Sequence, residues 1–178
     1  MVTLAIVAVL AVLAAPSINQ FLVKNQMNGV ASDFSTSILR SRNEAVSRNT
    51  CVSLCMSSSA ADAAPSCTVS GKNWQMGWIA FLNTSCDASL TEPAASNDLI
   101  FAKVTNGSQI LLDSTDDVPV RKMMFTPSGV PSLASSSNFS VLYLSAQNAY
   151  TKSYGVNICI DAQGRSRTIP VGKNCSNF

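Results

Sequence analysis

The stretch that decides the fold is residues 1–49, MVTLAIVAVLAVLAAPSINQFLVKNQMNGVASDFSTSILRSRNEAVSRN. Residues 1–15 contain one polar side chain, Thr3, and the first charge of the chain is Lys24. After Pro16, apolar residues recur at spacings of three and four, the pattern of a helix with one apolar face. These residues are Ile18, Phe21, Leu22, Met27, Val30, Ala31, Phe34, Ile38 and Ala45. The pattern predicts one long helix over residues 1 to about 49, with a kink at the proline.

The two parts of this helix need different surroundings. The first part is apolar on every side and needs lipid or the packed core of a helical filament, whereas the second needs a sheet on one side only. A membrane-spanning helix takes about 20 apolar residues, so this run is too short alone. No basic residues precede it as in a secretory signal, and we expect residues before Met1 to be missing. We expect a membrane or filament-core half over residues 1–24 and an amphipathic half over 25–49.

Beyond residue 50 the period changes to that of strands. Turn residues such as Asn106-Gly107 and Pro127-Ser128-Gly129 separate short candidate strands, which favours antiparallel pairing. The candidate strands are Thr50–Met56, Gln75–Leu82, Leu99–Val104, Gln109–Leu112, Lys122–Thr126, Phe139–Ser145, Tyr154–Ile160 and Arg165–Ile169. The fold class is therefore α+β: a long helix packed on an antiparallel β-sheet head domain over residues 50–178.

Charge is distributed unevenly along this head. The whole chain has a net charge of only +2, which excludes a globally basic nucleic-acid binder. Residues 51–119 carry two basic and seven acidic side chains, a net charge of −5. Residues 120–178 carry six basic side chains and one acidic, a net charge of +5. Such a division indicates either a basic face for an anionic partner or two solvated surfaces.

Six cysteines, all outside the apolar helix, favour disulfides in an oxidising compartment. Cys55 with Cys67 would close a short loop, and Cys159 with Cys175 would tie the last strands to the tail. Cys51 is then left to pair with Cys86 or to remain unpaired. A zinc site at the first three cysteines is disfavoured by their spacing and by the absence of histidine.

No catalytic set is visible, and we expect no enzyme activity, cofactor or metal. Without histidine the commonest general base is missing. Asp113, Asp116 and Asp117 are expected in a solvated loop rather than in a calcium site. Trp78 is expected in the core, where it packs a strand on the helix, and Trp74 at the surface.

Several motifs follow one another along the chain. The apolar run with Pro16 is followed by SILRSRNEAVSRNTCVSLC, by the strand WQMGWIAFLN, by the turn FTPSGV and by the C-terminal CIDAQGRSRTI with its Gly-Arg-x-Arg. In type and in order these motifs resemble the pilin helix and the following segments of the FimT/GspH family of type IV pilin-like minor pilins. The Gly-Phe-Thr-Leu-x-Glu processing signal of pilins is absent, so the resemblance implies that about seven mature residues and the leader are missing.

The resemblance implies a subunit held in the bacterial inner membrane, with its head in the periplasm, that is then extracted into an extracellular pilus. Its partners would be other minor pilins and the major pilin. Some relatives bind DNA for natural transformation through the Gly-Arg-x-Arg motif, while others prime pilus assembly or act as pseudopilins in type II secretion. A secreted, disulfide-stapled ligand-binding domain is the alternative outside this family.

The physical chemistry of that motif is consistent with a DNA contact. Asp161 and Gly164 suit the ends of a type I turn, and Arg165 and Arg167 then lie on one face of a strand, about 6.6 Å apart. Two adjacent guanidiniums can fork onto phosphate oxygens. The predicted DNA-binding residues are therefore Gly164, Arg165, Arg167, Lys152 and Lys173. Binding to double-stranded DNA would be independent of sequence and weak for each subunit. Two arginines on an edge strand that resists aggregation are the alternative.

Overall fold

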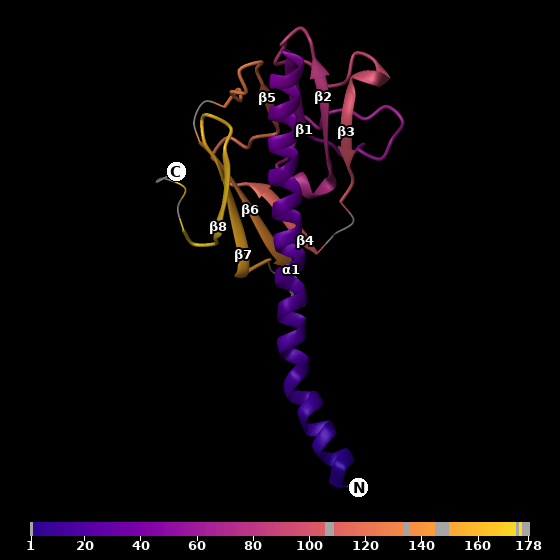
Figure 1. The fold of residues 1–178 in the computed structure, drawn as a ribbon, viewed down its shortest axis with the longest axis vertical. Coiled ribbons are helices and arrows are strands. Elements are labelled where there is room, and N and C mark those ends of the chain that lie inside the picture. Colours follow the sequence, from indigo (N-terminus) through magenta and orange to yellow (C-terminus); the bar gives the residue numbers. More distant parts are fainter. Residues whose placement is uncertain (1, 106–108, 134–135, 145–149, 174, 176–178) are drawn as a thin grey trace.

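The computed structural model describes residues 2–105, 109–133, 136–144, 150–173 and 175, and within them only the backbone of residues 2–17, 144 and 150–154. One helix, α1 (Val2–Arg48), precedes all the strands and runs without a break through Pro16 (Figure 1). In the described part of the chain, no helical segment is both long enough and apolar enough to cross a membrane. The helix ends where Asn49 adopts a left-handed conformation with a φ of 50°, and the Thr50 N–H then closes the last turn on the Ala45 carbonyl at 3.1 Å.

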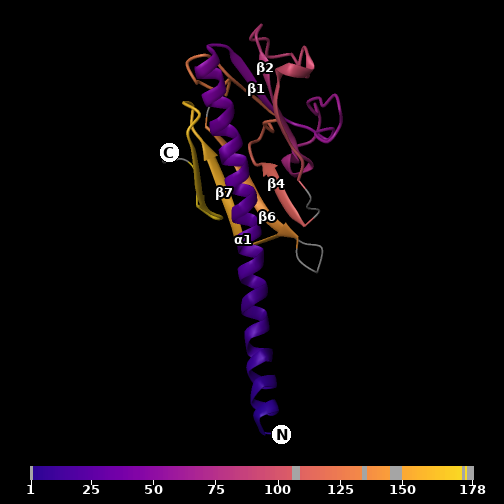
Figure 2. The same cartoon turned by 45° about the vertical axis from the view of Figure 1, so that its right-hand side comes forward.

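In its described residues the head contains two four-stranded antiparallel sheets, a division that the strand pattern alone had left open. In the first sheet the order is β3-β2-β1-β5, and in the second it is β4-β6-β7-β8. The strands of the first are β1 (Cys51–Met56), β2 (Trp78–Asn83), β3 (Leu99–Lys103) and β5 (Lys122–Phe125). Those of the second are β4 (Ile110–Ser114), β6 (Ser137–Leu144), β7 (Tyr150–Ile160) and β8 (Ser166–Pro170). Figures 1 and 2 show the upper half of α1 lying across both sheets and its lower half extending beyond them.

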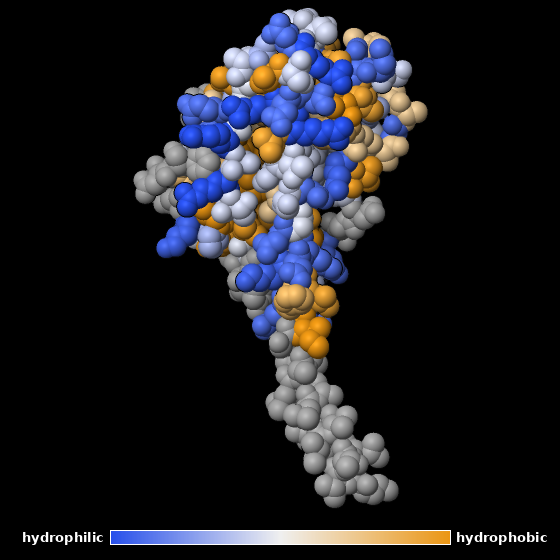
Figure 3. Space-filling view, in the orientation of Figure 1, coloured by the Kyte–Doolittle hydropathy of each residue, from blue (hydrophilic) through white to orange (hydrophobic). Residues whose placement is uncertain are grey.

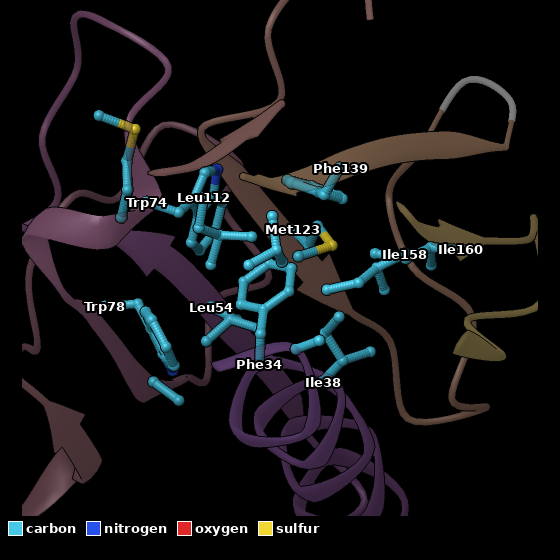
Figure 4. Packing of buried hydrophobic residues seen from close by; sticks show 14 of the residues in the cluster. Phe34, Ile38, Leu54, Trp74, Trp78, Leu112, Met123, Phe139, Ile158 and Ile160 are labelled. Atoms are coloured by element: carbon cyan, nitrogen blue, oxygen red, sulfur yellow. The ribbon is translucent and has the colours of Figure 1, made fainter. Parts of the chain in front are cut away.

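The predicted apolar face of α1 is the face that packs on the head. Met27, Ala31, Phe34, Ile38 and Ala45 are all buried, at helical spacings of three, four and seven residues. Phe34 is central: its ring makes edge-to-face contacts with Trp74, Trp78 and Phe139, with centroids 5.0 to 5.4 Å apart. Because Trp78 belongs to the first sheet and Phe139 to the second, one helix residue joins both (Figure 4).

The expectation that Trp74 lies at the surface is wrong. Its ring is fully buried, and its indole N–H donates a hydrogen bond to the Val120 carbonyl at 2.8 Å. A short 3-10 helix, η1 (Trp74–Met76), stands where the strand pattern was expected to begin at Gln75. Trp74 from this short helix and Trp78 from β2 both pack their rings against Phe34 of α1.

The expectation that Asp113 lies in a solvated loop is also wrong. Asp113 belongs to β4, is 6% exposed, and pairs with the exposed Lys72 at 3.3 Å. Burial of this carboxyl raises its pKa, against the opposing effect of the Lys72 ammonium. Asp116, farther along, is half-buried and accepts the Asn138 N–H, whereas Asp117 is exposed.

Three disulfides hold the loops of the head. Cys55 pairs with Cys67 and Cys159 with Cys175, as the spacing had suggested, and the third bond joins Cys51 to Cys86. The last of these spans 35 residues and fastens the loop after β2 to the start of β1. The Cys159–Cys175 bond fastens the segment after β8 to β7, and so it fixes the surroundings of the two arginines.

Candidate nucleic-acid interface

The predicted turn between the last two strands is present. The Gly164 N–H donates to the Asp161 carbonyl at 2.9 Å, and the Asp161 N–H donates to the Arg165 carbonyl at 3.0 Å. These two bonds close a tight hairpin that leads from β7 into β8. Arg165 therefore lies at the end of the turn, one residue before the strand, and Arg167 lies within the strand.

Gly164 is needed for the shape of this turn and is buried. Its φ is +75°, a conformation that side chains disfavour. A Cβ at this position would lie 3.1 Å from Pro131 Cδ and 3.2 Å from Phe125 Cε1. The glycine thus lets the turn pack closely against the end of β5, and it offers no exposed surface of its own. Its role as a DNA contact stays a prediction.

Arg165 is held by a carboxylate that the motif itself does not include. Its Nε donates to Asp161 Oδ2 at 2.6 Å, and its backbone N–H donates to Asp161 Oδ1 at 2.8 Å. The Asp161 side chain is 6% exposed, whereas that of Arg165 is 67% exposed. The Asp161 carboxylate thus orients the guanidinium through Nε, while most of the Arg165 side chain faces solvent. The signal for this pair was available in the sequence, since Asp161 precedes Arg165 by four residues across a predicted turn.

The electrostatics of this pair follow from its geometry. Burial of the Asp161 carboxyl acts to raise its pKa, but the backbone N–H groups and the guanidinium that surround it act more strongly in the other direction. The pKa of Asp161 consequently lies below its usual range. The carboxylate is therefore charged at neutral pH and offsets part of the positive charge of Arg165.

Arg167 is the freer of the two arginines. It is exposed and, within the described residues, its guanidinium has no hydrogen bond or ion pair. It lies opposite Cys159 in the β7–β8 ladder and so projects from the face that carries the Cys159–Cys175 disulfide. Because side chains alternate along a strand, Ser166 and Thr168 project from the other face, toward α1.

The two lysines of the prediction differ in what the structure shows of them. Lys173 is exposed just after β8, and its carbonyl accepts a hydrogen bond from the Asn157 side chain at 3.4 Å, which fixes its backbone against β7. Lys152 lies in β7, but its side chain falls outside the described residues. Arg165 and Arg167 lie at the start of β8 and Lys173 lies beyond its end, so these cations are spread along one edge of the head. Figure 3 shows hydrophilic side chains along this edge.

One basic residue near this edge was missed by the sequence analysis. Arg42 of α1 donates from Nε to the Gly129 carbonyl at 3.0 Å. That same carbonyl oxygen lies 3.4 Å from the position of a Cβ on Gly164, so Arg42 is next to the turn that precedes Arg165. The two arginines are 123 positions apart in the chain, and no local pattern connects them. Such a set of cations suits phosphate groups, which guanidinium and ammonium groups bind by charge-assisted hydrogen bonds.

Comparison with known proteins identifies one family that matches most of the chain. The family model described as type II transport protein GspH matches residues 30–164, about three quarters of the chain. The match covers the packed half of α1 and the head up to Gly164, and it stops just before Arg165 and Arg167. No curated protein sequence matches this chain.

Two crystal structures of the type IV minor pilin FimU of Pseudomonas aeruginosa share the fold. In one crystal form the TM-score is 0.61 at 18% identity, with 89% of this chain and 99% of FimU covered. In the other form the TM-score is 0.56 at 19% identity, with 85% and 99% covered. At such identities the likeness concerns the fold: a long helix followed by a β-rich head.

Proposed function

The chain belongs to the GspH family, and from this premise we propose that it is a minor pilin of a type IV pilus. It assembles at or near the pilus tip and binds double-stranded DNA for uptake in natural transformation. Other minor pilins and the major pilin are its protein partners. Before assembly it is held in the bacterial inner membrane with its head in the periplasm, and afterwards it is part of the extracellular pilus.

The shape of α1 supports the assembly part of this proposal. Residues from Met27 onward pack on the head, but Ile18, Phe21 and Leu22 are 51% to 64% exposed just below it. Figure 3 shows this apolar surface where the helix leaves the head. Exposed apolar side chains on a protruding helix favour contact with other helices or with lipid. Residues 1–24 would then form the buried half of the subunit in a membrane or filament.

The observation that carries the DNA-binding part is the exposed basic edge at β8. The Arg167 guanidinium and the Lys173 ammonium have no partner among the described residues, and Arg165 presents most of its side chain to solvent. Phosphate contacts by a few cations give weak, sequence-independent binding that falls steeply with salt. Such an affinity suits a subunit that must hold any incoming DNA and then release it.

DNA retardation by the purified full chain in a nonionic detergent tests this proposal. Arg165→Gln combined with Arg167→Gln is expected to abolish retardation at low salt. The matched control is Arg40→Gln with Lys103→Gln, which removes the same charge at the other side of α1, where Arg40 lies 4.8 Å from the Phe101 ring. The control variant should bind as the wild type does. Unchanged binding by a folded Arg165→Gln/Arg167→Gln protein would exclude the arginine pair as the DNA contact.

A pseudopilin of type II secretion is the second candidate, because the matching family is described by that transport role. Deletion of the gene separates the two. Loss of transformation with normal protein secretion supports the DNA-uptake pilin, and loss of secretion with normal transformation supports the pseudopilin.

A further inference from the structure

A groove of about 360 Å³ lies between α1 and β8, and neither the motif nor the family accounts for it. Its lining is mostly neutral and polar, with hydroxyl or amide groups on six of eight residues and no carboxylate. The lining residues are Asn28, Ala31, Ser32, Ser35, Thr36, Leu39, Ser166 and Thr168. Ser166 and Thr168 point into it because they lie opposite Ile160 and Ile158, which face the helix. The groove is therefore formed by the helix on one side and by the edge strand on the other.

The edge of β8 presents its backbone polar groups outward along this groove. The Arg165 carbonyl accepts the N–H of Asp161, which follows β7, and the Val171 N–H donates to the carbonyl of Gly155 in β7. In an antiparallel ladder every second residue forms such bonds, so the backbone N–H and C=O groups of the odd-numbered residues of β8 point toward β7. The N–H and C=O groups of Ser166 and Thr168 then point away from β7, where no described strand pairs with them. Proline at position 170 ends the series, since it has no N–H.

The helical side of the groove has a basic residue beyond each end. Lys24, Asn28, Ser35 and Arg42 recur at spacings of four and seven residues, which places them on one stripe of α1. Arg42 marks the end next to the β7–β8 turn, through its bond to the Gly129 carbonyl. Lys24 is exposed and, among the described residues, its ammonium has no hydrogen-bond or ion-pair partner. Arg42 follows Lys24 by eighteen positions of helix, so the stripe is about 27 Å long.

We propose that this groove seats one sugar-phosphate backbone of the bound DNA, an inference that rests on the proposed DNA binding. Hydroxyl, amide and backbone N–H groups are the usual neutral donors to phosphate and sugar oxygens, and they position DNA without reading its sequence. Ser166 and Thr168 supply both kinds of donor at the strand edge. Arg42 and Lys24 supply positive charge beyond the two ends of the groove. Arg165 and Arg167 supply positive charge on the opposite face of the β8 edge.

An extended peptide added to β8 is the competing occupant of this edge. The β8 edge offers such a peptide only two outward backbone N–H groups, those of Ser166 and Thr168, because Pro170 has no N–H. The cations around the groove, together with the absence of acidic lining residues, favour a polyanion over a peptide of unspecified charge. The observations thus favour DNA, and the peptide becomes an outcome of the test.

The test uses the full chain in nonionic detergent and measures affinity for double-stranded DNA by fluorescence anisotropy over a series of salt concentrations. Thr36→Val with Thr168→Val removes two hydroxyls from opposite walls of the groove at nearly constant shape. We expect about 5- to 30-fold weaker binding at every salt concentration with an unchanged salt slope, because the lost hydrogen bonds are neutral. Arg42→Gln should instead lower the slope by about 0.9.

The matched control is Thr84→Val with Thr91→Val, the same chemical change at two exposed threonines in the loop after β2. This variant should bind as the wild type does. The groove proposal is refuted if Thr36→Val/Thr168→Val and Arg42→Gln both bind DNA with wild-type affinity. If Arg165→Gln/Arg167→Gln loses binding in the same assay, the proposed DNA-binding function is still supported. In that case the edge is free for another class of partner, such as an extended peptide. Absence of binding by the wild type would instead refute the DNA-binding function itself.

Discussion

At the scale of single residues, the β7–β8 turn depends on Asp161 and Gly164 for different reasons. Asp161 accepts the N–H groups of Gln163 and Arg165 through Oδ1 and the Arg165 guanidinium through Oδ2. Gly164 supplies the positive φ and the close approach to Phe125 and Pro131. The carboxylate orients the arginine, and the glycine positions the whole turn against the core. In this Gly-Arg-x-Arg motif the glycine thus has a structural role, while the arginines present cations to solvent.

Gly164→Ala is expected to destabilise the head by more than backbone strain alone. The strain of a left-handed alanine is about 1–2 kcal/mol, and crowding against Pro131 adds about 1–3 kcal/mol. Gly172→Ala is the matched control, since Gly172 also has a positive φ of 90° but nothing within 4 Å of an added Cβ. Chemical unfolding with the disulfides intact measures both variants. Equal losses of stability would mean that the packing of Gly164 contributes nothing.

At the scale of elements, α1 holds the two sheets together through a few large side chains. Phe34 contacts aromatic rings of the first sheet and of the second, and Trp78 donates its indole N–H to the Ser37 hydroxyl at 2.8 Å. Across the helix, Lys103 of β3 pairs with Asp33 at 2.7 Å, an exposed ion pair of small energetic value. The head is therefore stabilised mainly by burial of the apolar face of α1.

Phe34→Ala should cost about 3–5 kcal/mol, the usual range for a fully buried phenylalanine. The same substitution at Phe21 is the internal control, because Phe21 lies on the same helix but is 64% exposed. Phe21→Ala should leave the unfolding midpoint of the head almost unchanged. Urea unfolding followed by tryptophan fluorescence reports on Trp74 and Trp78 directly. Similar losses in the two variants would show that α1 does not form the core of the head.

At the scale of the whole molecule, one helix serves two surroundings. Its 47 residues extend for about 70 Å, and the packed part begins near Met27. The segment that contains Ile18, Phe21 and Leu22 is exposed in the isolated subunit and available to a second helix or to lipid. The head presents its basic edge at β8, beside the same helix. In an assembled pilus, the helix would anchor the subunit while this edge stays at the surface.

Phe21→Asp should reduce incorporation into pili without unfolding the head. Burying a phenylalanine contributes about 1.5–3 kcal/mol, so its loss alone weakens assembly roughly tenfold or more, and a charge in an apolar contact adds to the loss. The amount of the subunit in sheared pilus fractions, relative to its amount in the cells, measures incorporation. Asn25→Asp, which adds the same charge at an exposed polar position on the same segment, is the control. Normal incorporation of Phe21→Asp would contradict a role for this helix surface in assembly.

The sequence by itself determined the helix, the approximate strands and the α+β class, because these depend on periodicity and turn residues that are close together in the chain. It also indicated which cysteines pair around short loops. The turn between Asp161 and Gly164 could likewise be predicted from the residues that form it.

Only the tertiary structure decided which of these residues meet. The burial of Trp74 and Asp113, the pairing of Arg165 with Asp161 and the division into two sheets depend on how the chain packs. Thr36 and Thr168 line the same groove between α1 and β8. Arg42 lies next to the β7–β8 turn through a hydrogen bond to Gly129, 87 positions away in the chain. Local propensity carries no information about such contacts, since they form only when the buried face of the helix brings distant segments together.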